Sequence, residues 1–295
     1  MTQGSRSNSV RITEVGPRDG LQNERELVPV ATKIQFVDRL SELGIPEIEV
    51  TSFVSAKWIP QLGDAEEVLC GIIRRPRTIY SALVPNERGL ESALQAGVDK
   101  IAIFVSATEG FSQRNTNGSI EEVLARIAPV VSRARSQSLP VRGYVSCVIA
   151  CPYDGPVDPS QVRTLCSRLL QLGVSELDLG DTIGVADPDS ISLLYEALSP
   201  IVAPGDTTLH LHDTTGHAIA TALRALEIGV RSFDASAGGI GGCPYAPGAP
   251  GNVATETLTK AIIDAGFDPG LDYQRVAEVG RWIRQQLAGL RGASA

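Results

Sequence analysis

The chain has 295 residues, of which 43% are hydrophobic, and carries a formal net charge of −8. This length lies within the range of a single α/β barrel, and the hydrophobic fraction is sufficient for a large core. The acidic balance argues against nucleic acid or a membrane surface as partner, since both usually require a basic patch, and no apolar run is long enough to span a bilayer.

Eight β-rich segments alternate with amphipathic segments from one end of the chain to the other. The predicted strands are residues 10–16, 47–53, 78–84, 100–106, 141–148, 176–182, 208–213 and 232–238. Four stretches repeat one pattern, in which an amphipathic segment passes through a glycine into a strand. Those glycines, which suit the left-handed position that ends a helix, are Gly44, Gly97, Gly173 and Gly229.

The alternation predicts an α/β fold, a (β/α)8 TIM barrel. An open doubly wound sheet is the competing arrangement, but the turn after the first predicted strand reads VGPRDG and lacks the expected GxGxxG fingerprint. We expect one catalytic domain over residues 1–295. It would have a short polar N-terminal extension at residues 1–9, a Gly/Pro-rich loop after the eighth strand and further helices at about residues 256–290.

Polar and ionisable residues collect at the predicted carboxyl ends of the strands, where a TIM barrel carries its active site. These residues are Arg18 and Asp19 after the first strand, Glu49 and Ser52 in the second, Asp181 and Thr182 in the sixth, and His210 and His212 in the seventh. The sequence therefore predicts a catalytic rim.

His210 and His212 give the sharpest local signal for a metal site. Residues two apart on a strand point to the same side, so both imidazoles can face the barrel mouth. Together with Asp19 and the amide oxygen of Asn252, they form an oxygen- and nitrogen-donor set that suits magnesium or manganese and is compatible with zinc or iron. The alternative is a pair of hydrogen-bonded structural histidines.

Two other candidates also have structural alternatives. Arg18 and Asp19 could form a salt-bridged turn at a strand end. Asp181 could cap a helix, because the sequence GDT precedes a predicted one.

The segment GGIGGCPYAPGAPGN, residues 238–252, surrounds Cys243 with six glycines and three prolines. Neither a regular helix nor a central strand tolerates this composition, so we expect a shaped loop, and such loops often carry catalytic groups. Five scattered cysteines do not make a disulfide framework in a chain of this size, and the N-terminal sequence has no apolar signal core. A reducing cytoplasm is the expected compartment.

Six motifs closely resemble the hydroxymethylglutaryl-CoA lyase family. They are VGPRDGLQNE, TSFVSAKWIPQLGD, RGYVSC, LGDTIG, HLHDTTGHA and GGIGGCPYAPGAPGNVATE. The resemblance extends from about Val10 to about Leu287, and the glycine-flanked cysteine followed by PYA is highly specific. It implies a TIM barrel that uses a divalent cation, Mg²⁺ or Mn²⁺, to cleave 3-hydroxy-3-methylglutaryl-CoA to acetyl-CoA and acetoacetate.

The resemblance also implies roles for single residues. Asp19, His210, His212 and Asn252 would bind the metal, Arg18 would meet the acyl-CoA carbonyl, and Cys243 would be the catalytic thiol. Glu49 and Asp181 would support catalysis, and His210 could share in proton transfer. The residues expected to bind substrate are Arg18, Ser52, Asn115, Ser119, Tyr144 and Thr182. Ala288 stands where animal enzymes carry a substrate-contacting asparagine, so that contact does not transfer.

Three other functions stay open at this point. The nearest is a lyase of longer 3-hydroxy-3-alkylglutaryl-CoA substrates, followed by an acetyl-CoA-condensing synthase and a metal-binding barrel without turnover. The resemblance further suggests a bacterial cytoplasmic homodimer, with leucine degradation and ketone-body formation as its usual setting.

Overall fold

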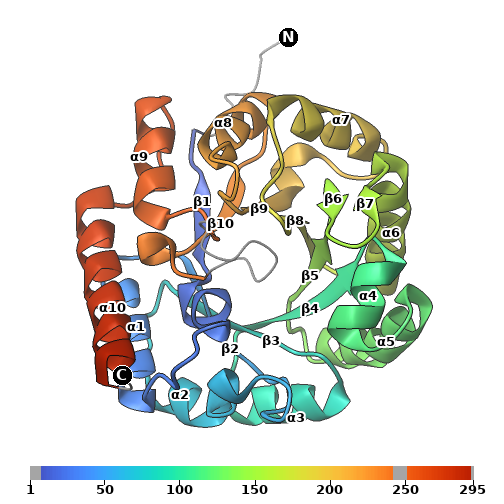
Figure 1. Cartoon of the computed structure of the whole chain (residues 1–295). Coiled ribbons are helices and arrows are strands. Elements are labelled where there is room, and N and C mark those ends of the chain that lie inside the picture. The colour runs from blue at the N-terminus through green and yellow to red at the C-terminus, as the bar shows by residue number, and fades with distance from the viewer. Residues whose placement is uncertain (1–7, 242–250, 294–295) are drawn as a thin grey trace.

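The computed structural model describes residues 8–241 and 251–293. Within them, eight parallel strands close into a barrel in the order β1-β10-β9-β8-β5-β4-β3-β2, and helices surround it (Figure 1). The barrel strands are β1 (Arg11–Glu14), β2 (Glu47–Ser52), β3 (Ile79–Leu83), β4 (Lys100–Ser106), β5 (Val141–Ser146), β8 (Glu176–Asp181), β9 (Thr207–Leu211) and β10 (Ser232–Ala235). The predicted (β/α)8 barrel is therefore confirmed, and each observed barrel strand overlaps a predicted one.

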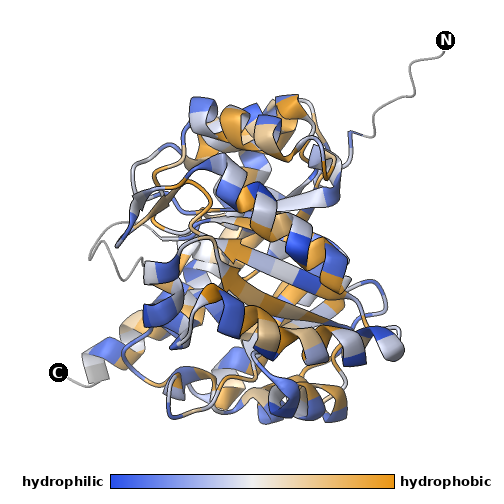
Figure 2. Ribbon diagram, turned by 90° about the vertical axis from the view of Figure 1, so that its right-hand side faces the viewer, coloured by the Kyte–Doolittle hydropathy of each residue, from blue (hydrophilic) through white to orange (hydrophobic). Residues whose placement is uncertain are grey.

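The helices of the outer ring lie between successive barrel strands and after the last one. They are α1 (Val30–Ser41), α2 (Ala65–Gly71), α3 (Glu87–Gln95), α4 (Glu109–Thr116), α5 (Ile120–Ser136), α6 (Pro159–Leu172), α7 (Pro188–Leu198), α8 (Ala218–Ile228), α9 (Thr255–Asp264) and α10 (Tyr273–Ala293). Hydrophobic residues concentrate where these helices meet the strands, and hydrophilic residues lie on the outside (Figure 2). Among the described helices, none is long and apolar enough to cross a bilayer.

Short elements at the strand ends were not expected from the sequence. A π-helical turn, η1 (Gly16–Gly20), follows β1, and a 3₁₀ turn, η4 (Ala237–Gly239), follows β10. Two further 3₁₀ turns are η2 (Pro60–Leu62) and η3 (Pro204–Asp206), and β6 (Ala150–Cys151) forms a small hairpin with β7 (Gly155–Pro156). The four repeated glycines all have positive φ, as predicted.

Charged side chains fill part of the barrel interior. Arg142 on β5 is buried, and its guanidinium lies 2.9 Å from Glu176 on β8 and 2.9 Å from Asp234 on β10. Lys100 on β4 pairs with Glu47 on β2 at 3.0 Å. Barrel interiors are usually filled by branched apolar side chains, so this network of paired charges is a specific feature of the chain.

Candidate active site

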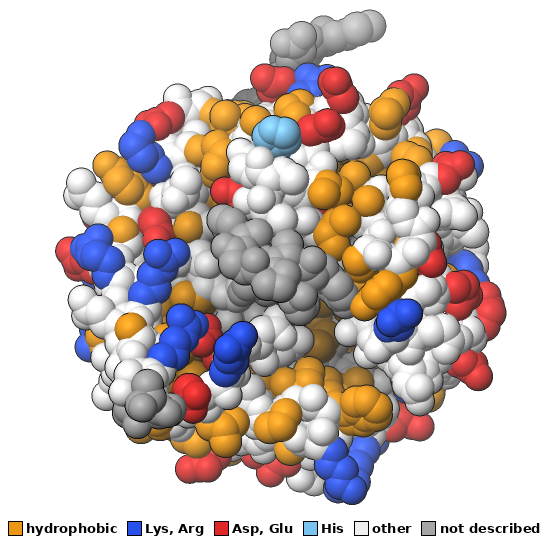
Figure 3. Space-filling model, in the orientation of Figure 1, with side chains coloured by type: hydrophobic (Ala, Val, Ile, Leu, Met, Phe, Trp, Pro, Cys, Tyr) orange, Lys and Arg blue, Asp and Glu red, His pale blue; other side chains and the backbone are white. Residues whose placement is uncertain are grey.

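The Arg18–Asp19 pair lies on the η1 turn, directly beyond the end of β1. The carbonyl of Val15 accepts hydrogen bonds from the backbone N–H groups of Arg18, Asp19 and Gly20 at 2.7–3.2 Å. This tight turn presents both side chains at the carboxyl end of the barrel, which is where such barrels hold their catalytic groups. Several Lys and Arg side chains lie beside the centre of the face drawn in Figure 3, although the chain as a whole is acidic.

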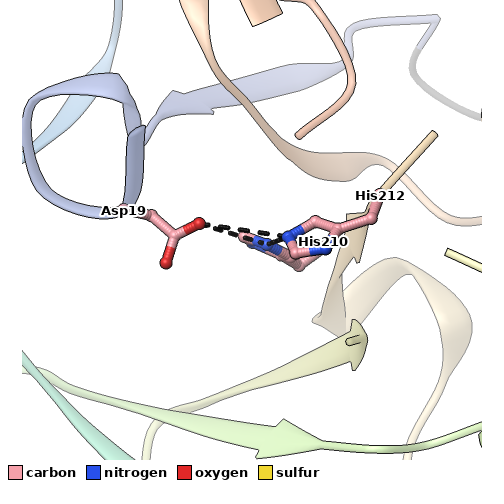
Figure 4. A group of neighbouring side chains, drawn as sticks. All are labelled: Asp19, His210 and His212. Carbon is pink, nitrogen blue, oxygen red and sulfur yellow. Dashed lines mark hydrogen bonds and ion pairs between the residues drawn. The ribbon is translucent and has the colours of Figure 1, made fainter. Parts of the chain in front are cut away.

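The two predicted histidines lie opposite this turn. His210 is in β9 and His212 directly follows it, and their Nε2 atoms are 3.3 Å apart. Each Nε2 is 4.0 Å from Oδ2 of Asp19 (Figure 4). One ligand atom from each of the three side chains therefore lies within 4.8 Å of the others.

Asn252 completes the group of predicted ligands from the other end of the chain. An antiparallel bridge places it beside His212, and its Nδ2 donates to Oδ2 of Asp19 at 2.8 Å. Rotating this side-chain amide by half a turn would direct its Oδ1, instead of Nδ2, toward the space between Asp19, His210 and His212. The structure thus brings together Asp19, His210, His212 and Asn252, as the sequence led us to expect, and their binding of a metal stays a prediction.

The protonation of these groups suits a cation. Burial opposes ionisation of Asp19, but the charge of Arg18, with the histidines, lowers its pKa to about 2. Burial, together with the neighbouring imidazole of His210, lowers the pKa of His212 to about 4, so its ring is neutral near pH 7. One carboxylate, two imidazoles and an amide fit a divalent cation such as Mg²⁺ or Mn²⁺.

Asp234, which the sequence pattern did not single out, orients one of these imidazoles. Its Oδ2 lies 3.1 Å from Nδ1 of His210, which leaves Nε2 of that ring directed at Asp19 and His212. A carboxylate in this position fixes the tautomer and ring orientation of a metal-binding histidine. Arg142 in turn donates to Oδ1 of Asp234 at 2.9 Å. The alternation of Ser232 and Asp234 with apolar neighbours in SFDA was the available signal for an inward carboxylate.

Arg18 is held by Glu49 and packs on Tyr144. The Nε atom of Arg18 donates to Oε2 of Glu49 at 2.5 Å, and its guanidinium lies 5.3 Å from the centre of the Tyr144 ring. The Tyr144 hydroxyl lies 3.1 Å from the same Glu49 oxygen. Although burial opposes its charge, Glu49 and Asp19 raise the pKa of Arg18, so it is a fixed cation. Arg18 also forms an ion pair with Asp19, so the salt-bridged turn that the sequence left open as an alternative is present. It lies beside the predicted metal site, because Asp19 is one of the predicted ligands.

Asp181 and Thr182 organise the turn after β8. Asp181 accepts hydrogen bonds from the N–H groups of Val185 and Ala186 at 3.2 and 2.8 Å, and burial raises its pKa to about 6. The idea that it caps a helix is wrong, because Asp187 is the N-cap of α7. The Thr182 hydroxyl accepts from the N–H of Cys147 at 2.8 Å.

The other predicted substrate-binding residues have local roles in the described structure. Ser52 is buried at the end of β2, and its hydroxyl accepts from the N–H of Val54 at 3.2 Å. Asn115 is exposed on α4, in the last turn of that helix. Ser119 is the N-cap of α5 and forms a capping box with Glu122. A substrate contact for these residues stays a prediction.

Cys243 lies outside the described residues, but both flanks of its segment are described and adjoin the site. The N–H of Asn252 donates to the carbonyl of Gly241 at 3.2 Å. A Cβ on Gly241 would lie 2.7 Å from Nδ2 of Asn252 and 2.9 Å from Cα of Gly20, and its φ is +97°. Only glycine permits this close approach of the flank to the η1 turn.

Comparison with known proteins identifies relatives that span the barrel. The family model described as HMGL-like matches residues 9–283. The chain is 47% identical to the cytoplasmic 3-hydroxy-3-methylglutaryl-CoA lyase of Rattus norvegicus, over 93% of this chain and 80% of the relative. It is 46% identical to the 3-hydroxy-3-isohexenylglutaryl-CoA/hydroxy-methylglutaryl-CoA lyase of Pseudomonas aeruginosa, over 97% of this chain and 95% of that protein.

The likeness extends to solved structures. The crystal structure of the HMG-CoA lyase from Brucella melitensis superposes with a TM-score of 0.92 at 47% identity, and the match covers 94% of this chain and 98% of that one.

Proposed function

The chain belongs to the HMGL-like family, and on that premise we propose that it is a metal-dependent carbon–carbon lyase that cleaves 3-hydroxy-3-methylglutaryl-CoA to acetyl-CoA and acetoacetate. The observation that carries the metal-dependent part is the convergence of Asp19, His210 and His212 at the carboxyl end of the barrel. A fixed cation, Arg18, lies next to this group, so a bound divalent cation and a guanidinium would both be available to stabilise the charge that such a cleavage develops.

Asp19, His210, His212 and Asn252 would hold the divalent cation. When bound, the cation supplies Lewis acidity, which makes the substrate's tertiary hydroxyl easier to deprotonate. The bond between C2 and C3 of the substrate must then break. The hydroxyl loses its proton, its oxygen forms the carbonyl of acetoacetate, and the bonding electrons move to C2 and onto the thioester oxygen.

Arg18 would stabilise the charge that develops on that thioester oxygen. Its guanidinium is buried and is fixed by Glu49, and a preoriented cation in a site of low polarity stabilises developing charge far more than a mobile one in water. Proton transfer to C2 then gives acetyl-CoA. We assign a proton transfer to Cys243 on the strength of the resemblance, because a thiol is an acid and base able to exchange protons near physiological pH.

The test is turnover by the metal-loaded protein. Acetoacetate release from 3-hydroxy-3-methylglutaryl-CoA, abolished by EDTA and restored by Mg²⁺ or Mn²⁺, would support the proposal. A folded, Mn²⁺-loaded protein that releases none would refute it.

A second substrate merits the same assay, because the Pseudomonas aeruginosa relative is named for both an isohexenyl and a methyl substrate. If kcat/KM is higher for 3-hydroxy-3-isohexenylglutaryl-CoA, the longer-chain alternative is correct. The condensing-synthase and non-catalytic alternatives are disfavoured by the lyase names of relatives that match more than nine-tenths of the chain. The homodimer and the setting in leucine degradation stay proposals; light scattering tests the first.

A further inference from the structure

Glu14, the last residue of β1, is a fully buried carboxylate on the side of the strand that faces the surrounding helices. Thr13 points into the barrel, where Arg142 donates to its hydroxyl at 2.9 Å. Side chains alternate along a strand, so Ile12 and Glu14 point the other way, toward the helices. Such a position normally holds an apolar side chain, as Ile12 illustrates.

Every hydrogen bond described for this carboxylate comes from a neutral donor. The N–H of Gly16 lies 2.8 Å from Oε1, the N–H of Ala237 lies 2.9 Å from Oε1 and 3.1 Å from Oε2, and the Thr255 hydroxyl lies 2.7 Å from Oε2. Burial raises the pKa of Glu14 to about 8, against the lowering effect of these donors. At neutral pH the group is therefore mostly a neutral carboxylic acid, and burying so polar a group is costly unless its hydrogen bonds are made, so packing alone does not explain its presence.

The three donors belong to three segments that all lead to the predicted metal site. Gly16 begins the η1 turn, which carries Arg18 and Asp19. Ala237 begins η4, after β10. Thr255 begins α9, shortly after Asn252. A Cβ on Gly16 would lie 2.6 Å from Oε1 of Glu14, so the turn packs directly on the carboxylate.

We propose that Glu14 is a positioning residue that holds the segments of Asp19 and Asn252 in fixed register, so that both can reach one cation. Two oxygens that accept from three segments join residues distant in sequence through a single side chain. The inference depends on one part of the proposed function, the assignment of Asp19 and Asn252 as metal ligands. An apolar side chain of similar size would fill the volume but leave three buried donors without partners, which frees the segments to move apart.

The test is the dissociation constant of Mn²⁺, measured on metal-free protein by the electron paramagnetic resonance signal of free Mn²⁺. Three variants separate the contributions. Glu14→Leu removes both acceptors, while Glu14→Gln keeps one oxygen for the backbone donors and can donate to the Thr255 hydroxyl. Thr255→Val removes one hydrogen bond alone and keeps the shape of the side chain. Asp64→Asn is the control, because its carboxylate also joins separate segments, through the buried Lys33 at 2.7 Å, outside this cluster.

We expect Glu14→Leu to raise the dissociation constant by about tenfold or more, the loss typical of residues that orient metal ligands. Thr255→Val should give a smaller rise, Glu14→Gln should stay close to the wild type, and Asp64→Asn should lower only the melting temperature. If Glu14→Leu does not fold, the Mn²⁺ dissociation constant of Thr255→Val still tests the proposal.

Wild-type affinity in folded Glu14→Leu or in Thr255→Val, or an equal loss in Asp64→Asn, would overturn the inference. A wild-type protein that binds Mn²⁺ but releases no acetoacetate would refute the proposed substrate and leave this measurement valid.

Discussion

Asn252 donates a hydrogen bond to Asp19 at 2.8 Å, although 233 residues separate the two along the chain. Asp19 follows the first barrel strand and Asn252 comes after the last, and these strands are neighbours because the barrel closes between β1 and β10. The closure of the barrel therefore creates the predicted metal site, which His210 of β9 and His212, directly after that strand, complete.

Loss of one imidazole should weaken metal binding directly. In His212→Ala we expect the Mn²⁺ dissociation constant to rise by more than about tenfold, because a ligand should matter at least as much as the residues that orient it. Titration of metal-free protein measures this. His217→Ala is the matched control, since His217 is exposed at the start of α8 and should bind Mn²⁺ as the wild type does. Equal affinities in all three proteins would contradict the ligand assignment.

Arg18 should act in the chemical step. We expect Arg18→Gln to lower kcat by about 10²–10³, the usual cost of removing a donor that stabilises an oxyanion. The variant also leaves Glu49 without its cation, so thermal unfolding should be followed in parallel. Arg168→Gln removes an exposed arginine that pairs with Glu121 and should keep full activity. A folded Arg18→Gln enzyme with a normal kcat would show that this cation is not used.

The free cysteines should differ sharply in reactivity at pH 8. Burial raises the pKa of both Cys147 and Cys166 to about 12, so neither is a thiolate there, whereas Cys70 is exposed. With an aromatic disulfide reagent, Cys70 should react in the native protein, and Cys147 and Cys166 only after unfolding in guanidinium. A Cys70→Ser protein then provides a low background against which to measure Cys243. Rapid native labelling of Cys166, identified by peptide mapping, would contradict the burial described.

Asp181 should make stability depend on pH in the metal-free protein. Burial raises its pKa in the folded state from 3.8 to about 6, so the folded protein binds this proton more tightly than the unfolded chain. The resulting stabilisation is complete below about pH 4 and is lost as the pH rises through 6. Between pH 4 and pH 7 the free energy of unfolding should fall in the wild type relative to Asp181→Asn by up to about 3 kcal/mol. Urea unfolding in EDTA measures this, and a difference between the two proteins that does not vary with pH would be the contrary result.

The strands could be predicted from the sequence because each is specified locally. Alternating β-rich residues mark the strand, and a glycine such as Gly97 or Gly173 marks the helix end before it. Both glycines adopt the left-handed conformation expected of them. The rim residues followed from the same pattern, because parallel strands end on one side of a barrel. His210, His212 and Asp19 therefore meet as the sequence indicated.

The orienting residues could not be predicted in this way because their roles depend on distant partners. Asp234 acts by hydrogen bonding to His210. Glu14 acts by accepting hydrogen bonds from Gly16, Ala237 and Thr255. No local sequence pattern predicts which donors will surround a carboxylate, because these donors come from distant segments that meet only when the barrel closes. Ser119 is the opposite case, because it was expected to bind substrate and the described structure gives it a helix-capping role.

The most direct test of the lyase assignment compares acetoacetate release from 3-hydroxy-3-methylglutaryl-CoA by the wild type and by Cys243→Ser, each with Mg²⁺ and with EDTA. The account predicts metal-dependent release by the wild type and a rate lower by orders of magnitude in the serine variant, because serine is a far weaker acid than cysteine. No release by folded, metal-loaded wild-type protein would contradict the assignment to this substrate.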